Sequence, residues 1–415
     1  MNNFTAPRFP TTRREFLRYG SRGIGLLAFS RFAPGFLVQS TLAATPAPEK
    51  DRTILVLVQL AGGNDGLNTV IPFEDADYYR LRPTLGINKA ETLRLNDVVG
   101  LHPSCMELQA LFREGQLGIV QNVGYPNPNR SHFRSSEIWE TGSESGEFLP
   151  SGWLGRFMDN ACAGAPADAD PAAVHLTSDL PQSLSSEHEH ATFGLSNDVR
   201  GRRQDESVTL LEHMLGGHGH DHGNEGFLKH TMMDALVTEK RVYKVLGDYR
   251  PEAAYPNSNF AGSLRNVAAL IAAGLSTRIY FVSLSGFDTH SNQVRQHANL
   301  LKTLSEGLAA FQGDLKAHRL DGQVTTMTFS EFGRRPSENQ SGGTDHGTAA
   351  PLFVMGSRVQ AGLHGKAPAL KVARNEDLTF STDFRQIYAT MLDRWLGCPS
   401  AAVLGKGFTP LPIFA

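Results

Sequence analysis

The chain has 415 residues, of which 40% are hydrophobic and 20% charged, and its formal net charge at pH 7 is −3. This length and hydrophobic content suit one large α/β domain or two ordinary domains with packed cores. The slight acidic excess argues against nucleic-acid binding, because surfaces that bind nucleic acids are usually basic.

The N-terminus has the features of a bacterial twin-arginine signal peptide. Arg13 and Arg14 are followed by a weakly apolar run over about residues 24–38 and by small residues at Ala43 and Ala44. Paired arginines, a modest apolar run and small residues at a cleavage point define such signals. The alternative is a basic amphipathic start without a targeting role.

We therefore expect residues 1–44 to direct export through the Tat translocase, which would put the mature protein in the periplasm or outside the cell. Without them the chain keeps 33 basic and 41 acidic residues, a net charge of −8. The apolar run contains Arg31 and Pro34 and is shorter than the ~20 apolar residues that span a bilayer. We expect no stable membrane span and no nucleic-acid partner.

Short β-rich apolar runs alternate with helical patterns along the rest of the chain, which predicts an α/β domain with a mostly parallel sheet. In chain order, the first half contains a strand at 53–60, a helix at 105–114, a strand at 118–123 and a helix at 131–141. The second half contains a helix at 259–273, strands at 278–284, 324–329 and 351–355, and helices at 293–318 and 383–396. We expect a single domain over residues 45–415.

Residues 181–256 differ from the rest of the chain because they are polar and contain no run that resembles a strand. We expect a mostly helical insertion or lid. Its histidine-rich run includes His218, His220 and His222, separated by Gly219 and Asp221. Ordering such a flexible run around an ion costs much conformational entropy, so we expect only weak, adventitious metal binding there.

Three cysteines are present, namely Cys105, Cys162 and Cys398. Export would permit a disulfide, but three widely spaced cysteines do not form a disulfide framework. One bonded pair with one free thiol and three buried thiols are both compatible with this pattern.

Acidic residues and histidines stand in the loops beside four predicted strands. They are Asp65, Asp288, His290, Glu331, Asp345 and His346. Ligands of open α/β sheets collect at the carboxyl ends of the strands, and gathered carboxylates repel one another unless a cation lies between them. We expect one or two divalent ions, with zinc favoured and manganese or calcium as alternatives. For any single loop, a turn-forming Asp or a helix cap is the better explanation of the acidic residue, and only the four loops together favour a metal.

Ser131 is a candidate nucleophile. It stands where a polar, Pro-rich loop enters a helical pattern, and a helix N-terminus stabilises an anion or an alkoxide. Arg130 and Arg134 flank it and could grip a phosphate or sulfate group. The competing interpretation is that Ser131 only caps the helix.

Five motifs in order, GGNDGLN, NRSHF, FDTH, SEFGR and DHG, resemble the bacterial, often Tat-exported family called domain of unknown function 1501. That family is placed in the alkaline phosphatase superfamily with sulfatases and cofactor-independent phosphoglycerate mutases. The resemblance extends from about residue 53 to the C-terminus. It implies an alkaline-phosphatase-like three-layer sandwich and an exported, metal-dependent hydrolase of phosphate or sulfate esters. The attacking group would be a serine or a metal-activated water.

The resemblance also implies roles for individual residues. Asp65 would bind one metal facing Ser131, while Asp288, His290 and His346 would bind the other. Glu331 would be the acidic residue of an acidic–histidine pair. The residues expected to contact the anionic ester substrate are Asn64, Arg130, His132, Arg134 and Arg334.

Two departures from the superfamily pattern keep alternatives open. The histidine follows Asp288 by two positions rather than four, and Phe332 stands where a metal-binding histidine is expected, a gap that His132 could fill. Another register would pair Asp345 with His346 and use His364 as the late histidine. A non-catalytic metal-binding or accessory protein with the same fold is therefore the competing hypothesis.

Overall fold

The computed structural model describes residues 36–37, 52–161, 170–195 and 238–414. The twin-arginine motif, Cys162 and the histidine-rich run at 218–222 lie outside the described residues, so the predictions made for them stay predictions.

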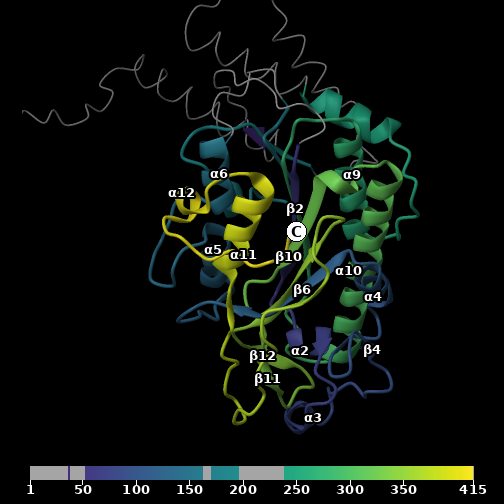
Figure 1. Cartoon of the computed structure of the whole chain (residues 1–415), viewed down its shortest axis with the longest axis vertical. Coiled ribbons are helices and arrows are strands. Elements are labelled where there is room, and N and C mark those ends of the chain that lie inside the picture. The colour runs from purple at the N-terminus through teal and green to yellow at the C-terminus, as the bar shows by residue number, and fades with distance from the viewer. Residues whose placement is uncertain (1–35, 38–51, 162–169, 196–237, 415) are drawn as a thin grey trace, which may run out of the picture.

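A large, mostly parallel sheet forms the centre of the molecule (Figure 1). Its strands, in spatial order, are β1 Phe36–Leu37, β8 Thr192–Gly194, β7 Ala173–Leu176, β9 Ile279–Ser285, β2 Ile54–Ala61, β10 Val324–Phe329, β13 Ala350–Met355, β6 Leu117–Gly124 and β14 Gly362–His364. The short strand β15 Thr382–Asp383 also pairs with β6. Only β1 and β13 run antiparallel to their neighbours.

Helices cover both faces of this sheet (Figure 1). On one face lie α4 Met106–Arg113, α9 Asn259–Ala272 and α10 Gln293–Ala317. On the other lie α5 His132–Thr141, α6 Trp153–Ala161, α11 Phe384–Thr390 and α12 Ser400–Leu404, with the π-helical segment η3 Met391–Leu396 directly after α11. The predicted three-layer α/β sandwich is confirmed.

The alternation of side chains along β2 explains the two layers of core. Val56 and Val58 pack into the hydrophobic cluster under α4, α9 and α10, whereas Leu55 and Leu57 pack into the cluster under α5, α6 and α11. All four side chains are fully buried. A strand covered on both faces is apolar throughout, which is why its sequence pattern was readily recognised.

Smaller elements gather at one end of the sheet, near α2 and α3 in Figure 1. They are α2 Gly66–Thr69, α3 Ala76–Leu81, the sheet of β3 Val70–Ile71, β4 Leu93–Arg94 and β5 Gly100–Leu101, and the pair of β11 Arg334–Glu338 and β12 Thr344–His346. The 3₁₀ turns are η1 Gln182–Leu184 and η2 Asp321–Gln323.

The prediction for residues 181–256 needs a correction. We expected no strand there, but β8 lies within this stretch and pairs in parallel with β7. Its three residues are too few for a periodic signal. A helix over residues 238–248 agrees with the helical part of the prediction, and residues 196–237 lie outside the described parts.

Two further expectations can be compared with the structure. Cys105 and Cys398 are both free and buried, so they do not form a disulfide with each other. In the parts of the chain that the structure describes, no helix has the length and apolar character needed to cross a membrane.

Candidate functional site

The candidate site lies at the carboxyl ends of three neighbouring parallel strands. β9, β2 and β10 are adjacent in the sheet and point the same way. The loops that follow them carry Asp288, Asp65 and Glu331 respectively. The N-terminus of α5 reaches the same edge, because the carbonyl of Arg130 accepts a hydrogen bond from the Nδ1 of His346 over 2.8 Å.

Three imidazoles surround the carboxylate of Asp288. The Nε2 atoms of His290 and His346 lie 3.0 and 3.1 Å from its Oδ1, and the Nε2 of His132 lies 3.5 Å from its Oδ2. The Nε2 atoms of His290 and His346 are 2.9 Å apart. We call these four residues the histidine cluster.

The other ring nitrogen of each histidine faces an acceptor outside the cluster. The Nδ1 of His132 lies 2.9 Å from Oε1 of Glu331, and that of His290 lies 3.4 Å from Oδ1 of Asp345. His346 Nδ1 bonds the Arg130 carbonyl, as described above. A metal-binding histidine characteristically donates its outer N–H to such a group, which fixes the ring with its inner nitrogen toward the ion.

The protonation states also suit metal binding. Partial burial alone would raise the pKa of Asp288, but the hydrogen bond from Arg334 and the nearby His346 hold it at about 2. Burial lowers the pKa of His346, although the neighbouring Asp288 carboxylate opposes this. Near neutral pH the site therefore presents an ionised carboxylate and a neutral imidazole.

Within the described residues, His132, Asp288 and His346 can bring one ligand atom each within 4.8 Å of one another, as a metal site requires. Two imidazoles and one carboxylate are a chemically suitable donor set for zinc. A possible His/Asp metal site is thus present, and His290 stands beside it.

Arg334 fixes the backbone around this site. Its buried guanidinium donates to the carbonyls of Gly62, Gly63 and Thr344, and to Oδ1 of Asp288 over 2.6 Å. Gly62 has φ +119°, and a Cβ there would come within 2.4 Å of the Asp288 nitrogen. Only glycine permits this close approach of the two loops.

Asp65 has a different environment. It is 1% exposed, and its Oδ2 accepts hydrogen bonds from Arg82 over 2.7 Å and from Gln293. Burial would raise the pKa of Asp65, but the Arg82 guanidinium holds it below its usual value. Its Oδ1 has no hydrogen-bond partner among the described residues. No cluster histidine contacts this carboxylate through a hydrogen bond in the described parts of the chain.

Asn64 belongs to the same buried network. Its Oδ1 accepts hydrogen bonds from Thr69 and His297 over 3.0 and 3.1 Å, while its Nδ2 is buried without a partner among the described residues. Burial lowers the pKa of His297 to about 4, so this histidine is neutral near pH 7.

Ser131 stands directly before α5 and is exposed, between Arg130 and His132. Its backbone has the extended conformation of an N-cap, but its side chain makes no capping hydrogen bond. The interpretation that Ser131 only caps the helix is therefore weakened, because the hydroxyl does not perform that role here.

The three predicted substrate arginines have different surroundings. Arg134 is engaged by Glu137 and by the carbonyls of Ser145 and Glu147, and Arg334 is buried in the framework. Arg130 pairs with Asp377 over 3.1 Å while its side chain remains 43% exposed.

Several of the predicted metal ligands thus lie close together, but they occupy different positions in the site. Asp288, His290 and His346 form the cluster with His132, which we had assigned to substrate. Glu331 and Asp345 lie behind two of the histidines, and Asp65 lies apart. The Nε2 of His364 donates to the Gln360 carbonyl over 2.7 Å, and His364 makes no hydrogen bond to a residue of the cluster within the described residues. This favours His346, and not His364, as the late histidine.

Arg82, Gln293 and His297 were missed by sequence reasoning. All three are buried beside Asp65 or Asn64. Arg82 follows α3, and the other two lie on one face of the first turns of α10 at a spacing of four residues. That spacing of polar residues on an otherwise apolar helix face was the available signal.

The sequence profile described as "Protein of unknown function (DUF1501)" matches residues 52–400. The chain belongs to this family. The predicted family is therefore confirmed, and its description assigns no activity. No curated protein sequence matches the chain.

Several solved structures are similar to the chain at low identity. Ps i-CgsB in complex with k-i-k-neocarrahexaose has a TM-score of 0.40 and 10% identity, covering 86% of this chain and 73% of that one. The zinc complex of the C-terminal periplasmic domain of EcEptC from Escherichia coli has a TM-score of 0.34 and 11% identity, and the match covers 77% of each chain. The alkaline phosphatase from the Antarctic bacterium TAB5 has a TM-score of 0.30 and 10% identity, and the match covers 74% of this chain and 93% of that one. Similarity at this level carries no activity over to this chain.

Proposed function

We propose that this DUF1501 protein is an exported, metal-dependent hydrolase of phosphate or sulfate esters. The observation that carries the proposal is the histidine cluster, in which three Nε2 atoms face Asp288 while each Nδ1 faces an outer acceptor. In a metal centre, the inner nitrogens of the imidazoles face the ion and acceptors behind the rings hold them in that orientation. The three imidazoles around Asp288 have this arrangement.

We propose one ion, held by His132, Asp288 and His346, with His290 as a fourth donor. Zinc is favoured because imidazole nitrogens dominate this set, whereas calcium takes oxygen ligands. Glu331 and Asp345 would act as acceptors behind His132 and His290 rather than as ligands. An ion held there would supply positive charge that stabilises a nearby oxyanion.

Asp65 is left out of the proposed ligand set. The buried Arg82 guanidinium already neutralises its charge, and Arg82 and Gln293 both bond its Oδ2. In this respect Arg82 supplies the positive charge that a second ion would otherwise provide.

Ser131 is the proposed nucleophile. Its exposed side chain is not used for capping. Ser131 stands between Arg130, whose carbonyl bonds His346, and His132, which belongs to the cluster. The first turn of a helix has N–H groups without intrahelical acceptors, which favour the alkoxide over the neutral hydroxyl. Arg130 would bind the ester's anionic oxygens, since its guanidinium is the most accessible of the three predicted arginines.

Export in the folded state would suit such a site. The proposed ligands extend from His132 to His346 in the sequence, so the ion can bind only after the sheet has assembled. Residues 1–44 would deliver the folded protein through the Tat translocase to the periplasm or the exterior.

The test is a panel of p-nitrophenyl phosphate, phosphodiester and sulfate esters, with protein exported by its native host. Wild type should release p-nitrophenol from one ester class, and Ser131→Ala should abolish the release. Ser136→Ala, on the same helix, is the matched control and should keep activity. A Ser131→Ala variant as active as wild type would exclude the serine mechanism.

A non-catalytic metal-binding or accessory protein is the second candidate. It is favoured by the engagement of Arg134 and Arg334 in internal contacts, which leaves Arg130 as the main group for an anionic substrate. Stoichiometric metal together with an inactive wild type across the panel would support this candidate over the hydrolase.

A further inference from the structure

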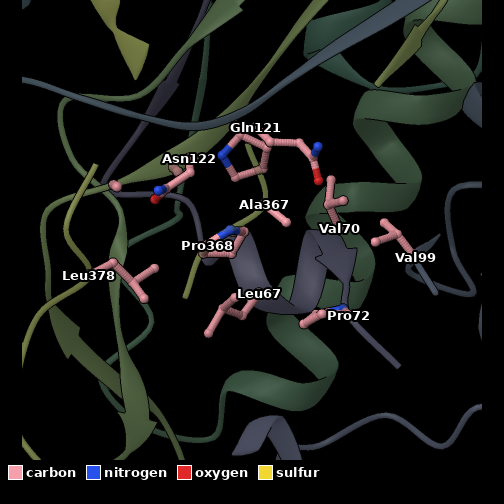
Figure 2. Close-up of a pocket in the computed structure, with 13 residues that line it drawn as sticks. Leu67, Val70, Pro72, Val99, Gln121, Asn122, Ala367, Pro368 and Leu378 are labelled. Atoms are coloured by element: carbon pink, nitrogen blue, oxygen red, sulfur yellow. The ribbon is translucent and has the colours of Figure 1, made fainter. Parts of the chain in front are cut away.

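A hollow whose lining includes no residue of the histidine cluster lies between α2, the ends of β6 and β13, and the segment around residues 367–378 (Figure 2). It comprises about 400 Å³ of empty space, including its mouth. Leu67, Val70, Val99 and Leu378 contribute apolar surface. None of the described residues that line it is charged, and none belongs to the histidine cluster.

A β-bulge brings polar groups into this apolar hollow. Val123 pairs with Ala350 and Val120 pairs with Leu352, so Gln121 and Asn122 together oppose the single residue between 350 and 352. That residue is Pro351, which has no N–H for the ladder and is tolerated in sheets at bulges. Along a regular strand, consecutive side chains point to opposite faces. At this bulge both Gln121 and Asn122 line the hollow.

The amides of these two residues have unused hydrogen-bonding capacity. Asn122, with φ +50°, donates from Nδ2 to the Thr379 carbonyl over 2.9 Å, but its Oδ1 is buried without a partner among the described residues. Gln121 is 7% exposed, and its side-chain amide makes no hydrogen bond within the described parts of the chain. Figure 2 shows this amide beside Val70 and Ala367.

We propose that this hollow binds a small, neutral, mainly apolar molecule that carries an amide or hydroxyl group. Its N–H or O–H would donate to Oδ1 of Asn122, and its oxygen would accept from the Gln121 amide. Such a ligand satisfies Oδ1 of Asn122, whose burial without a partner is costly. Small-molecule pockets are mostly apolar with a few polar groups that orient the ligand, and the lining of this hollow has the same character.

The uncharged lining distinguishes this ligand from the anionic ester proposed for the histidine cluster. A phosphate, sulfate or carboxylate would lose its hydration without meeting a cation. The two proposals rest on different residues, so either can fail without the other.

Benzamide is the probe, and its binding to the full chain can be followed by ligand-observed NMR. Benzoate has the same shape with a negative charge, and toluene lacks the polar group. We expect benzamide to bind in the millimolar range or tighter, and benzoate and toluene at least tenfold more weakly.

Two variants test the site itself. Gln121→Leu removes the amide, and Ala367→Trp covers the hollow from an exposed rim position, where it does not endanger folding. Both should weaken benzamide binding tenfold or more. Gln109→Leu, which changes a buried glutamine on α4, should leave binding unchanged. Absence of benzamide binding to wild type, equally tight benzoate binding, or benzamide binding that survives Ala367→Trp would overturn the proposal.

Discussion

Asp288 and Asp65 follow two adjacent parallel strands at the same edge of the sheet, yet their surroundings differ. The Asp288 side chain is 46% exposed and faces three imidazoles, while its Oδ1 accepts a hydrogen bond from Arg334. The Asp65 side chain is 1% exposed and is paired with the fully buried Arg82. Position in the fold therefore does not determine what a carboxylate does.

The difference lies in how each negative charge is neutralised. At Asp65 the protein supplies its own cation, and the buried pair holds the small elements near α2 and α3 against the sheet. At Asp288 one carboxylate oxygen bonds Arg334, but the carboxylate stays accessible and is surrounded by imidazole nitrogens, which suits an external cation. The following predictions separate a structural carboxylate from a metal-binding one.

The largest effect should come from breaking the buried pair. Arg82→Met would leave Asp65 as an unpaired buried charge, which typically costs about 3–5 kcal/mol of unfolding free energy. Urea denaturation measures this loss. The double variant with Asp65→Leu should recover most of the stability, because removing both charges together is often neutral. An unfolding free energy of Arg82→Met within about 1 kcal/mol of the wild-type value would contradict a structural role for the pair.

The supporting shell of the histidine cluster should affect metal binding rather than stability. Glu331→Gln removes the charged acceptor behind His132 and should weaken zinc binding about 10–100-fold, measured by competition with a chelating dye. Glu338→Gln is the control, because this buried carboxylate bonds Thr84 and Leu85 instead of a cluster histidine. Equal losses in both variants would point to a general folding defect.

Acid should destabilise the network around Asp65. The pKa of His297 is about 4 in the folded protein, below its usual value of about 6.5, so the unfolded chain takes up the proton first as the pH falls. The stability that His297 contributes is complete above pH 6.5 and is lost toward pH 4. Between pH 6.5 and 5 the loss should be about 2 kcal/mol.

Urea denaturation at pH 6.5 and pH 5 measures the direction and the size of this change in unfolding free energy. His297→Gln should reduce the loss, while the neighbouring His102, whose pKa burial also lowers to about 4, maintains part of it. A variant with the same pH dependence as wild type would exclude His297 as the titrating group.

The smallest effect concerns substrate. Arg130→Ala should raise KM for the active ester up to about tenfold with a smaller change in kcat, because an exposed arginine contributes ground-state binding. Arg335→Ala is the matched control, since Arg335 lies beside the same Asp377 and should leave KM unchanged. A loss in kcat alone would give Arg130 a different role.

The large elements were predictable because their periodicity is strong. β10 has the predicted bounds, and α9 and α10 each end one residue earlier than predicted. β7 and β8 were missed because strands of three or four residues do not show a distinct period. The bulge at Gln121 and Asn122 depends on pairing with a distant Pro351, which local patterns do not reveal.

The residues of the site were predictable only in part. Asp288, His290 and His346 stand beside strand ends, where ligands of α/β sheets collect. The environment of Asp65 could not be foreseen, because Arg82 and Gln293 reach it through tertiary packing from α3 and α10. The position of Glu331 behind His132, 199 residues away in the chain, likewise depends on the assembled sheet.

Metal analysis of the exported protein tests the central claim most directly. We expect one equivalent of divalent ion in wild type, zinc being favoured, and close to none in His346→Ala. Folded Asp65→Asn should retain the full equivalent. Two equivalents in wild type, or loss of metal from Asp65→Asn but not from His346→Ala, would contradict the account.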